Sequence, residues 1–76
     1  METSIASLRI GERGVIEEIS FDDIPLSLLE MGCLPGESVE LLQRAPLHDP
    51  LYIRVNGSHL AIRTETAAQI LITKEY

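Results

Sequence analysis

The sequence of 76 residues has few aromatic side chains and almost no cysteine. It contains no tryptophan, and its aromatic residues are Phe21, Tyr52 and Tyr76. Without aromatic platforms, the chain is poorly suited to stack on nucleotide bases or to grip proline-rich peptides. A single cysteine, Cys33, excludes an internal disulfide, so we expect it to be a small core residue.

Basic residues are also scarce. The chain has 6 lysines and arginines against 12 aspartates and glutamates, which gives a net charge of −6. Because binding to a phosphate backbone depends on a basic surface, this charge disfavours nucleic acid and anionic membranes as partners. No apolar run approaches the roughly 20 residues of a membrane span, and the N-terminus lacks the pattern of a signal peptide. The composition therefore predicts a small cytoplasmic protein that does not insert into the membrane.

The residues that could carry chemistry do not form a catalytic or metal-binding set. The sequence has no nucleophile paired with a base and no glycine-rich phosphate loop followed by lysine. His48, His59 and Cys33 are its soft metal ligands, and they lie far apart without helical spacing. We expect one domain over residues 1–76, with its core at about 8–73, and with no catalytic residue, cofactor or built-in metal.

The chain is organised around a short helix within residues 22–36. Asp22 or Asp23 is expected to cap the N-terminus of the helix, and Pro25 suits its first turn, where amides lack helical partners. Ile24, Leu28 and Met31 follow the spacing of one helical face and are expected to be buried. The main helix is therefore predicted within residues 23–31.

Two glycines end this segment. Gly32 can adopt the left-handed conformation that stops a helix. Pro35 and Gly36 then supply the fixed φ and the positive φ of a type II turn. We expect a strand to start at Glu37.

The remaining segments alternate as β-strands do. Residues 1–7 are polar, so we expect a loose start before Leu8 and Ile10 pack on the body. Within residues 15–19, Glu17 and Glu18 are expected on opposite faces of an edge strand or a sharply bent strand, which keeps them from acting as an acid–base pair. Residues 38–44 form the next predicted strand.

The second half of the chain predicts a loop, a hairpin and a last strand. Pro46 and Pro50 mark residues 45–50 as a loop. Asn56-Gly57 between two alternating segments is a strong signal for a two-residue hairpin turn. Thr64 is expected to cap a helical turn over residues 65–69, before a strand at 70–73. These elements amount to a mostly β barrel of about five strands, with one helix after the first strand and a helical turn before the last.

Several spaced motifs resemble the FeoA family, the small cytoplasmic proteins associated with bacterial ferrous iron transport. The similarity runs from about Leu8 to Ile72. It is carried by the runs at residues 28–32, 35–36, 45–47, 49–51 and 60–63, with Ala67 and Ile70. The resemblance implies an SH3-like barrel without enzymatic activity. It also implies work beside FeoB, a membrane iron transporter with a cytosolic GTP-binding domain, at the inner face of the membrane.

Two positions depart from the family pattern. Members commonly have an arginine where this chain has Ser27, and a glycine where it has His48. The first change removes a long cation from the helix, and the second places a side chain in a tight turn that usually prefers glycine. Neither is expected to change the fold.

The helix carries more leucines than one buried face can hold. Leu26 and Leu29 lie off the expected buried stripe beside Glu30, and Leu34 follows in the turn. Clustered exposed leucines on a small acidic domain are typical of a binding patch. We therefore expect Leu26, Leu29, Glu30 and Leu34 to contact the partner.

Three hypotheses about function follow. The leading one is an accessory module that binds the cytosolic part of FeoB and modulates its assembly or GTP-driven activity. The alternative is a metal-responsive sensor or oligomerisation module, in which Fe(II) or Zn(II) binds histidine and carboxylate ligands. A proline-rich peptide binder ranks last, because an SH3-like fold alone does not imply that function.

Overall fold

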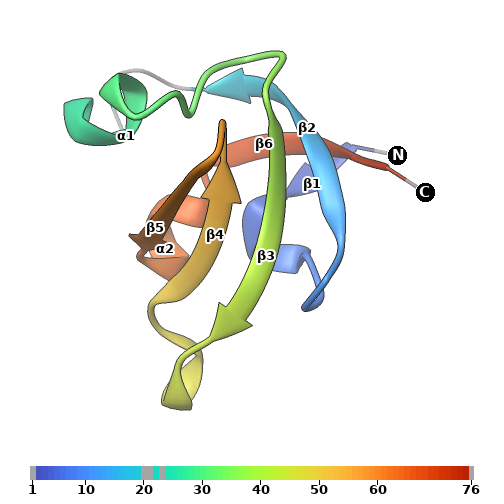
Figure 1. Cartoon of the computed structure of the whole chain (residues 1–76), viewed down its shortest axis with the longest axis vertical. Helices are drawn as coiled ribbons and strands as arrows, with labels where there is room; N and C mark the ends of the chain where they lie inside the picture. Colours follow the sequence, from blue (N-terminus) through green and yellow to red (C-terminus); the bar gives the residue numbers. More distant parts are fainter. Residues whose placement is uncertain (1, 20–21, 23, 76) are drawn as a thin grey trace.

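The computed structural model describes residues 2–19, 22 and 24–75, apart from the side chains of Glu2 and His48. One antiparallel sheet contains six strands in the order β1-β6-β2-β3-β4-β5. The strands are β1 (Glu2–Ser4), β2 (Arg13–Ile19), β3 (Ser38–Arg44), β4 (Leu51–Val55), β5 (Ser58–Ile62) and β6 (Ile70–Glu75). The sheet curls into an open barrel with β1 and β5 as its edges (Figure 1). The predicted mostly β barrel is confirmed, with one strand more than the expected five.

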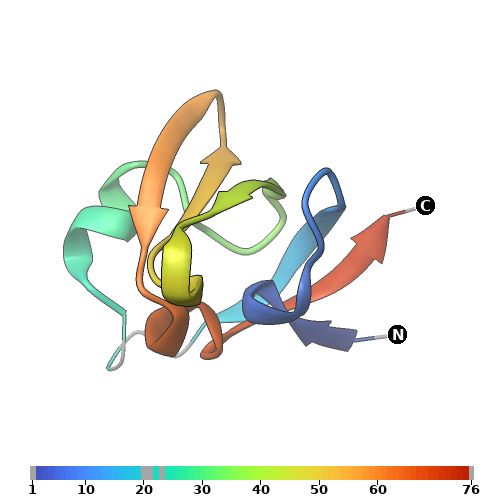
Figure 2. The same ribbon diagram turned by 90° about the horizontal axis from the view of Figure 1, so that it is seen from below.

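Short helical segments connect the strands. They are η1 (Ile5–Ser7), α1 (Leu26–Glu30), η2 (Pro46–His48) and α2 (Thr64–Ala67). Both ribbon views place α1 at one end of the molecule, on the side away from β1 and the end of β6 (Figures 1 and 2). By contrast, α2 packs against η1. The helix after the first predicted strand and the helical turn before the last strand are therefore both present.

The expectation of a loose N-terminal segment is wrong for residues 2–7. The backbone of β1 pairs with β6, and the side chain of Ile5 is fully buried. The guanidinium of Arg44 donates hydrogen bonds to the carbonyls of Ala6 and Leu8, at 2.8 and 2.7 Å. Leu8 is buried as predicted, whereas Ile10 is 63% exposed, in the turn before β2.

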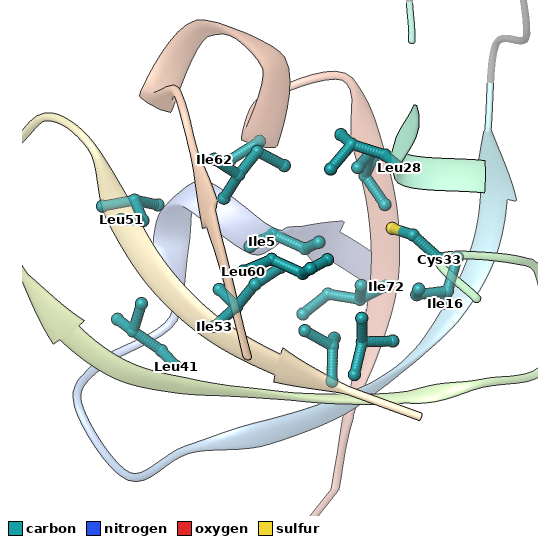
Figure 3. Close-up of a cluster of buried hydrophobic side chains, with 14 of the residues drawn as sticks. Ile5, Ile16, Leu28, Cys33, Leu41, Leu51, Ile53, Leu60, Ile62 and Ile72 are labelled. Atoms are coloured by element: carbon teal, nitrogen blue, oxygen red, sulfur yellow. The ribbon is translucent and has the colours of Figure 1, made fainter. Parts of the chain in front are cut away.

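Aliphatic side chains fill the barrel (Figure 3). Every strand from β2 to β6 contributes to this core, and Ile5, Leu8, Ile24, Leu28 and Ala67 complete it from the connecting segments. Cys33 is a free, fully buried thiol, which confirms its predicted place as a small core residue. Burial away from water raises the pKa of this thiol.

A β-bulge explains the irregular alternation of β2. Its pairing with β6 shifts register between Ile16 and Glu18, so Ile16 and Ile19 both point into the core. Glu17 and Glu18 are both exposed, so the expectation that they occupy opposite faces is wrong. The strand is also not an edge, because it lies between β6 and β3.

The predicted hairpin and the strand before it are confirmed. β3 spans 38–44, as its alternation predicts and one residue later than the start at Glu37 expected from the turn, and a second bulge between Leu41 and Gln43 leaves Gln43 exposed. Asn56 and Gly57 have φ of +51° and +76°, the positive values of a type I′ turn.

The loop at residues 45–50 contains η2 and ties the barrel to α2. Within it, Leu47 has φ of +69° and is 94% exposed. The carboxylate of Asp49 accepts a hydrogen bond from the backbone N–H of Thr64 at 2.8 Å. Thr64 is thus the first residue of α2 rather than its cap, and the prediction of a Thr64 cap is wrong: the capping oxygen comes from another loop.

Candidate partner-binding site

The helix α1 begins without a side-chain cap. Pro25 occupies the N-cap position with φ of −56° and ψ of 137°, and its carbonyl accepts from the N–H of Leu28 at 3.0 Å. The prediction that Asp22 would cap the helix is wrong, and so is the place of Pro25 inside its first turn. Asp23 lies outside the described residues. The helix has five residues, Leu26–Glu30, and lies within the predicted range of 23–31.

The end of α1 is fixed by two backbone hydrogen bonds around Gly32. The N–H of Gly32 donates to the carbonyl of Leu29 at 3.1 Å, and the N–H of Cys33 donates to Leu28 at 3.0 Å. With φ of +98° at Gly32, this is a Schellman motif. It confirms the predicted helix stop and directs Cys33 into the core beside Leu28 (Figure 3).

A type II turn then leads into β3. Gly36 has φ of +93°, and the N–H of Glu37 donates to the carbonyl of Leu34 at 3.1 Å. Two further hydrogen bonds join this turn to Ile16 of β2, at 2.7 and 2.9 Å. The predicted turn is confirmed, and the segment after α1 is firmly attached to the sheet.

Exposed apolar side chains gather on α1 and this turn. Leu26 is 66% exposed, Met31 43% and Leu34 40%, while Leu29 is partly buried against the core. The prediction that Met31 is buried is wrong, because the helix ends at Glu30 and the chain reverses at Gly32. We call Leu26, Leu29, Glu30, Met31 and Leu34 the helix surface; Glu30 is its exposed charge. The structure thus places all four expected contact residues on one segment and adds Met31.

The hairpin turn between β4 and β5 lies directly beside this segment. A Cβ at Gly32 would stand 2.6 Å from Nδ2 of Asn56 and 2.9 Å from its Cβ, so glycine permits close contact with that side chain. The sequence suggested the turn and the helix stop separately. It contained no signal that they touch.

An apolar hollow separates α1 from the edge strand β5. Its volume is about 160 Å³, and its walls include Pro25, Ser27 and Leu28 on one side and Ala61 and Ile62 on the other. Arg63 and, from α2, Thr66 also line it. Ser27 lines this hollow. The arginine that the family commonly has at this position would add a positive charge there.

A second hollow, of about 280 Å³, lies over β2, β3 and the hairpin turn. Its charged residues are Arg13, Arg54, Glu37 and Glu40, and Arg54 forms an ion pair with Glu40. Opposite charges thus occur side by side. The hollow has no excess of one charge to attract an anion or a cation.

The potential metal ligands do not converge in the described part of the chain. Cys33 is buried, His59 is exposed on β5, and the side chain of His48 lies outside the description. Among the described residues, no group of three histidine, cysteine, aspartate or glutamate side chains is arranged to hold a metal ion.

None of the described helices has the length and hydropathy needed to cross a bilayer.

Comparison with known proteins identifies the family. Residues 3–74 match the FeoA domain. The chain belongs to the FeoA family. It is 33% identical over 67 residues to the Fe(2+) transport protein A/Fe(2+) transporter FeoB fusion protein of Porphyromonas gingivalis (strain ATCC BAA-308 / W83). That alignment covers 87% of this chain and 8% of the fusion protein, so the chain spans only a small part of that relative.

Solved structures of FeoA proteins share the fold. A crystal structure of an iron uptake regulatory protein (FeoA) has 25% identity and a TM-score of 0.84, covering 99% of each chain. The Stenotrophomonas maltophilia FeoA, crystallised with zinc and described as an SH3 domain protein, has 24% identity and a TM-score of 0.78. The alignment covers 95% of this chain and 94% of that one. The barrel is therefore SH3-like, as the resemblance implied, and the family connects the chain with bacterial ferrous iron transport.

Proposed function

We propose that this FeoA domain is a non-catalytic accessory protein of ferrous iron uptake that binds the cytosolic part of a FeoB transporter. Binding would modulate the assembly of the transporter or its GTP-driven activity. The observation that carries the proposal is the Porphyromonas fusion protein, in which transport protein A and FeoB share one chain. Covalent fusion holds two domains at high effective concentration, which benefits domains that act together.

The helix surface is the contact that we propose on this chain. Leu26, Met31 and Leu34 are exposed on a segment whose backbone is fixed by the Schellman motif and the type II turn. A rigid backbone loses little conformational entropy on binding, so apolar side chains placed on it contribute efficiently to affinity. Leu29 and Glu30 complete the patch.

The test is a titration of the cytosolic part of FeoB with wild-type chain and with Leu26→Asp. An aspartate in place of the most exposed apolar side chain of the helix surface should weaken binding by about 30-fold or more, as for an interface hot spot. Leu47→Asp is the matched control, because Leu47 is more exposed than Leu26 and belongs to the loop after β3, which lies at the opposite end of the barrel from α1 (Figure 1). It should bind as wild type does.

Leu26→Asp is preferable to the same change at Leu29, because Leu29 packs partly on the core and its loss would perturb the fold. Unchanged affinity in a folded Leu26→Asp, with loss of affinity in Leu47→Asp, would move the interface to the η2 loop. Unchanged affinity in both would reject the leucines as contacts.

The proposed contact also predicts its response to salt. With Ser27 in place of the family's usual arginine, the helix offers apolar surface and the single charge of Glu30. Ionic strength mainly screens exposed charges, so the part of the affinity due to the helix surface, measured as the ratio of wild-type to Leu26→Asp affinity, should vary weakly with salt. A steep loss of affinity between low and physiological salt would indicate an electrostatic interface elsewhere.

A metal-responsive module is the second candidate, favoured by the zinc bound to the Stenotrophomonas FeoA. For this chain it would require ligands from more than one copy or from the residues outside the description, because no described cluster of three ligands exists. Sedimentation with and without Zn(II) separates the two candidates. Metal-dependent oligomers support the sensor, and an unchanged mass supports the accessory protein.

A further inference from the structure

The strand β5 is an open edge of the sheet. Within the described chain it pairs with β4 on one side, and no strand pairs with its other side. The opposite edge, β1, has only three residues. β5 therefore offers the longer free backbone edge.

The register shows which backbone groups face outward. A two-residue type I′ turn makes Val55 and Ser58 a hydrogen-bonded pair, and such pairs alternate along the ladder. Leu60 opposite Ile53 is the next hydrogen-bonded pair. The N–H and C=O groups of His59 and Ala61, which lie between these pairs, consequently point away from β4.

This edge lacks the usual protection against pairing. Natural edge strands carry lysine, proline or a bulge. β5 has none of these: its sequence is Ser-His-Leu-Ala-Ile, and its pairing with β4 is regular, whereas β2 and β3 each contain a bulge. An extended chain could therefore form two hydrogen bonds at His59 and two at Ala61.

The apolar hollow adjoins the same edge. Ala61 and Ile62 form one of its walls, and α1 supplies the other through Pro25, Ser27 and Leu28. Its volume of about 160 Å³ is comparable with apolar cavities of about 150 Å³ that hold a benzene molecule. The hollow thus has room for one aliphatic side chain of a strand paired with β5.

The net charge of the chain indicates which kind of segment would pair with β5. A second copy of this chain would bring a further net charge of −6 to a chain that already carries −6. Arg63 follows β5 and also lines the hollow, and the carboxylate of Asp49, 3.6 Å from its guanidinium, offsets its charge. The unbalanced charge of the chain therefore favours an incoming segment that carries basic residues.

We propose that β5 binds an extended segment of alternating aliphatic and basic residues as an added antiparallel strand, with one aliphatic side chain in the hollow beside α1. This proposal rests on the proposed function only for the identity of the partner, whose cytosolic part would supply the segment. Main-chain hydrogen bonds to His59 and Ala61 would provide affinity, and the hollow would provide selectivity for size. The added strand would lie next to the helix surface, so that one partner could use both.

The first test uses a synthetic heptapeptide of alternating lysine and valine and the 15N-labelled full chain. We expect affinity of about 1 mM or better, and slower hydrogen exchange at the amides of His59 and Ala61 while the N–H of Leu60 is unchanged. An alternating glutamate and valine peptide is the matched control and should not bind. Absence of binding, equal binding of both peptides, or binding without protection of these two amides would overturn the proposal.

Two variants test the backbone directly. Ala61→Pro removes the outward N–H without removing a bond to β4, whereas Ala61→Ser keeps it. After circular dichroism confirms the fold, Ala61→Pro should weaken peptide binding by about tenfold and Ala61→Ser by less than about twofold. Equal affinity of both folded variants contradicts strand addition; if Ala61→Pro does not fold, the exchange measurement on the unchanged chain decides.

The peptide experiment does not depend on FeoB. A chain that binds the basic peptide at β5 but not the cytosolic part of FeoB overturns the proposed partner and supports the edge site. A chain that binds FeoB with unprotected His59 and Ala61 amides supports the partner and overturns the edge site. Protection of these amides by self-association without peptide would make a second copy the occupant and overturn the proposal.

Discussion

Hydrogen bonds hold α1 at its C-terminal end and α2 at its N-terminal end. α1 starts at Pro25 without a side-chain cap and is held at its C-terminal end by Gly32 and the buried Cys33. α2 is held at its start, where Asp49 accepts the N–H of Thr64, and it buries Ala67 against the barrel. α1 buries Leu28, packs Leu29 partly on the core and leaves Leu26 exposed. The difference is that α2 packs on the barrel, whereas α1 leaves Leu26 exposed to solvent, where we propose that a partner binds.

Gly32→Val should produce the largest loss of stability, because it breaks the fastening of α1. The change forces a β-branched residue to φ of +98° and places its Cβ within 3 Å of Asn56. Backbone strain and overpacking together should cost about 3–5 kcal/mol of unfolding free energy. Urea denaturation followed by circular dichroism measures the loss. A cost below that of Gly36→Val would contradict the contact with Asn56.

Gly36→Val is the comparison for backbone strain alone. Gly36 also has positive φ, +93°, but a Cβ there would meet nothing within 4 Å. The expected cost is about 1–3 kcal/mol, from the type II turn only. An unchanged melting temperature would contradict the turn, and Pro35→Ala serves as a nearby control that leaves Gly36 intact.

Asp49→Ala should loosen α2 at its fastened end. Loss of the oxygen that accepts the Thr64 N–H should cost about 0.5–2 kcal/mol, the range for a lost helix cap. Asp49→Asn retains an acceptor oxygen and removes the charge that faces Arg63. If Asp49→Asn costs as much as Asp49→Ala, the ion pair rather than the hydrogen bond is responsible.

Leu26→Asp should leave stability within about 0.5 kcal/mol of wild type, because Leu26 is 66% exposed on the side of α1 away from the core. The same substitution should strongly weaken binding to FeoB, so the two measurements separate fold from interface. Thermal denaturation and the titration are made on one preparation. A large loss of stability would show that α1 is part of the barrel's support, as α2 is.

The smallest expected effect is that of metal. At low micromolar Fe(II) or Zn(II), the isolated chain should show no stoichiometric heat of binding, because neither helix region nor any other described part assembles three ligands. Isothermal titration calorimetry checks this expectation. One-to-one binding that disappears in a His48→Ala, His59→Ala double variant would instead promote the sensor.

Local signals predicted most of the fold. The hairpin at Asn56-Gly57, the stop at Gly32 and the turn at Gly36 each depend on backbone conformations that particular residues favour, and all three are present. β3 was predicted with its observed bounds because its alternation is regular at its start and a turn precedes it. These features need no knowledge of distant parts of the chain.

Long-range pairing accounts for what the sequence did not reveal. Glu2, Thr3 and Ser4 have no apolar pattern and become a strand only because β6 supplies their partner. The cap of α2 comes from Asp49 rather than from Thr64, and the hollow beside α1 depends on how β5 approaches the helix. Of the four expected contact residues, Leu26 and Leu34 are well exposed and Leu29 is partly buried, and the role of all four as contacts stays a prediction.

The side chain of Asn56, in the hairpin turn, lies close to Gly32 at the end of α1. We therefore expect the hairpin turn to influence the angle of α1 to the sheet. The helix is attached to the sheet through its last residues, and the side chain of Asn56 packs against that attachment, so we expect it to act as a wedge that sets the angle of α1. Asn56→Gly would preserve the positive φ required by the turn and remove the wedge. The chemical composition of the helix surface would then stay the same while its direction changed. Such a variant would separate the direction of the proposed contact surface from its composition, which most substitutions alter together.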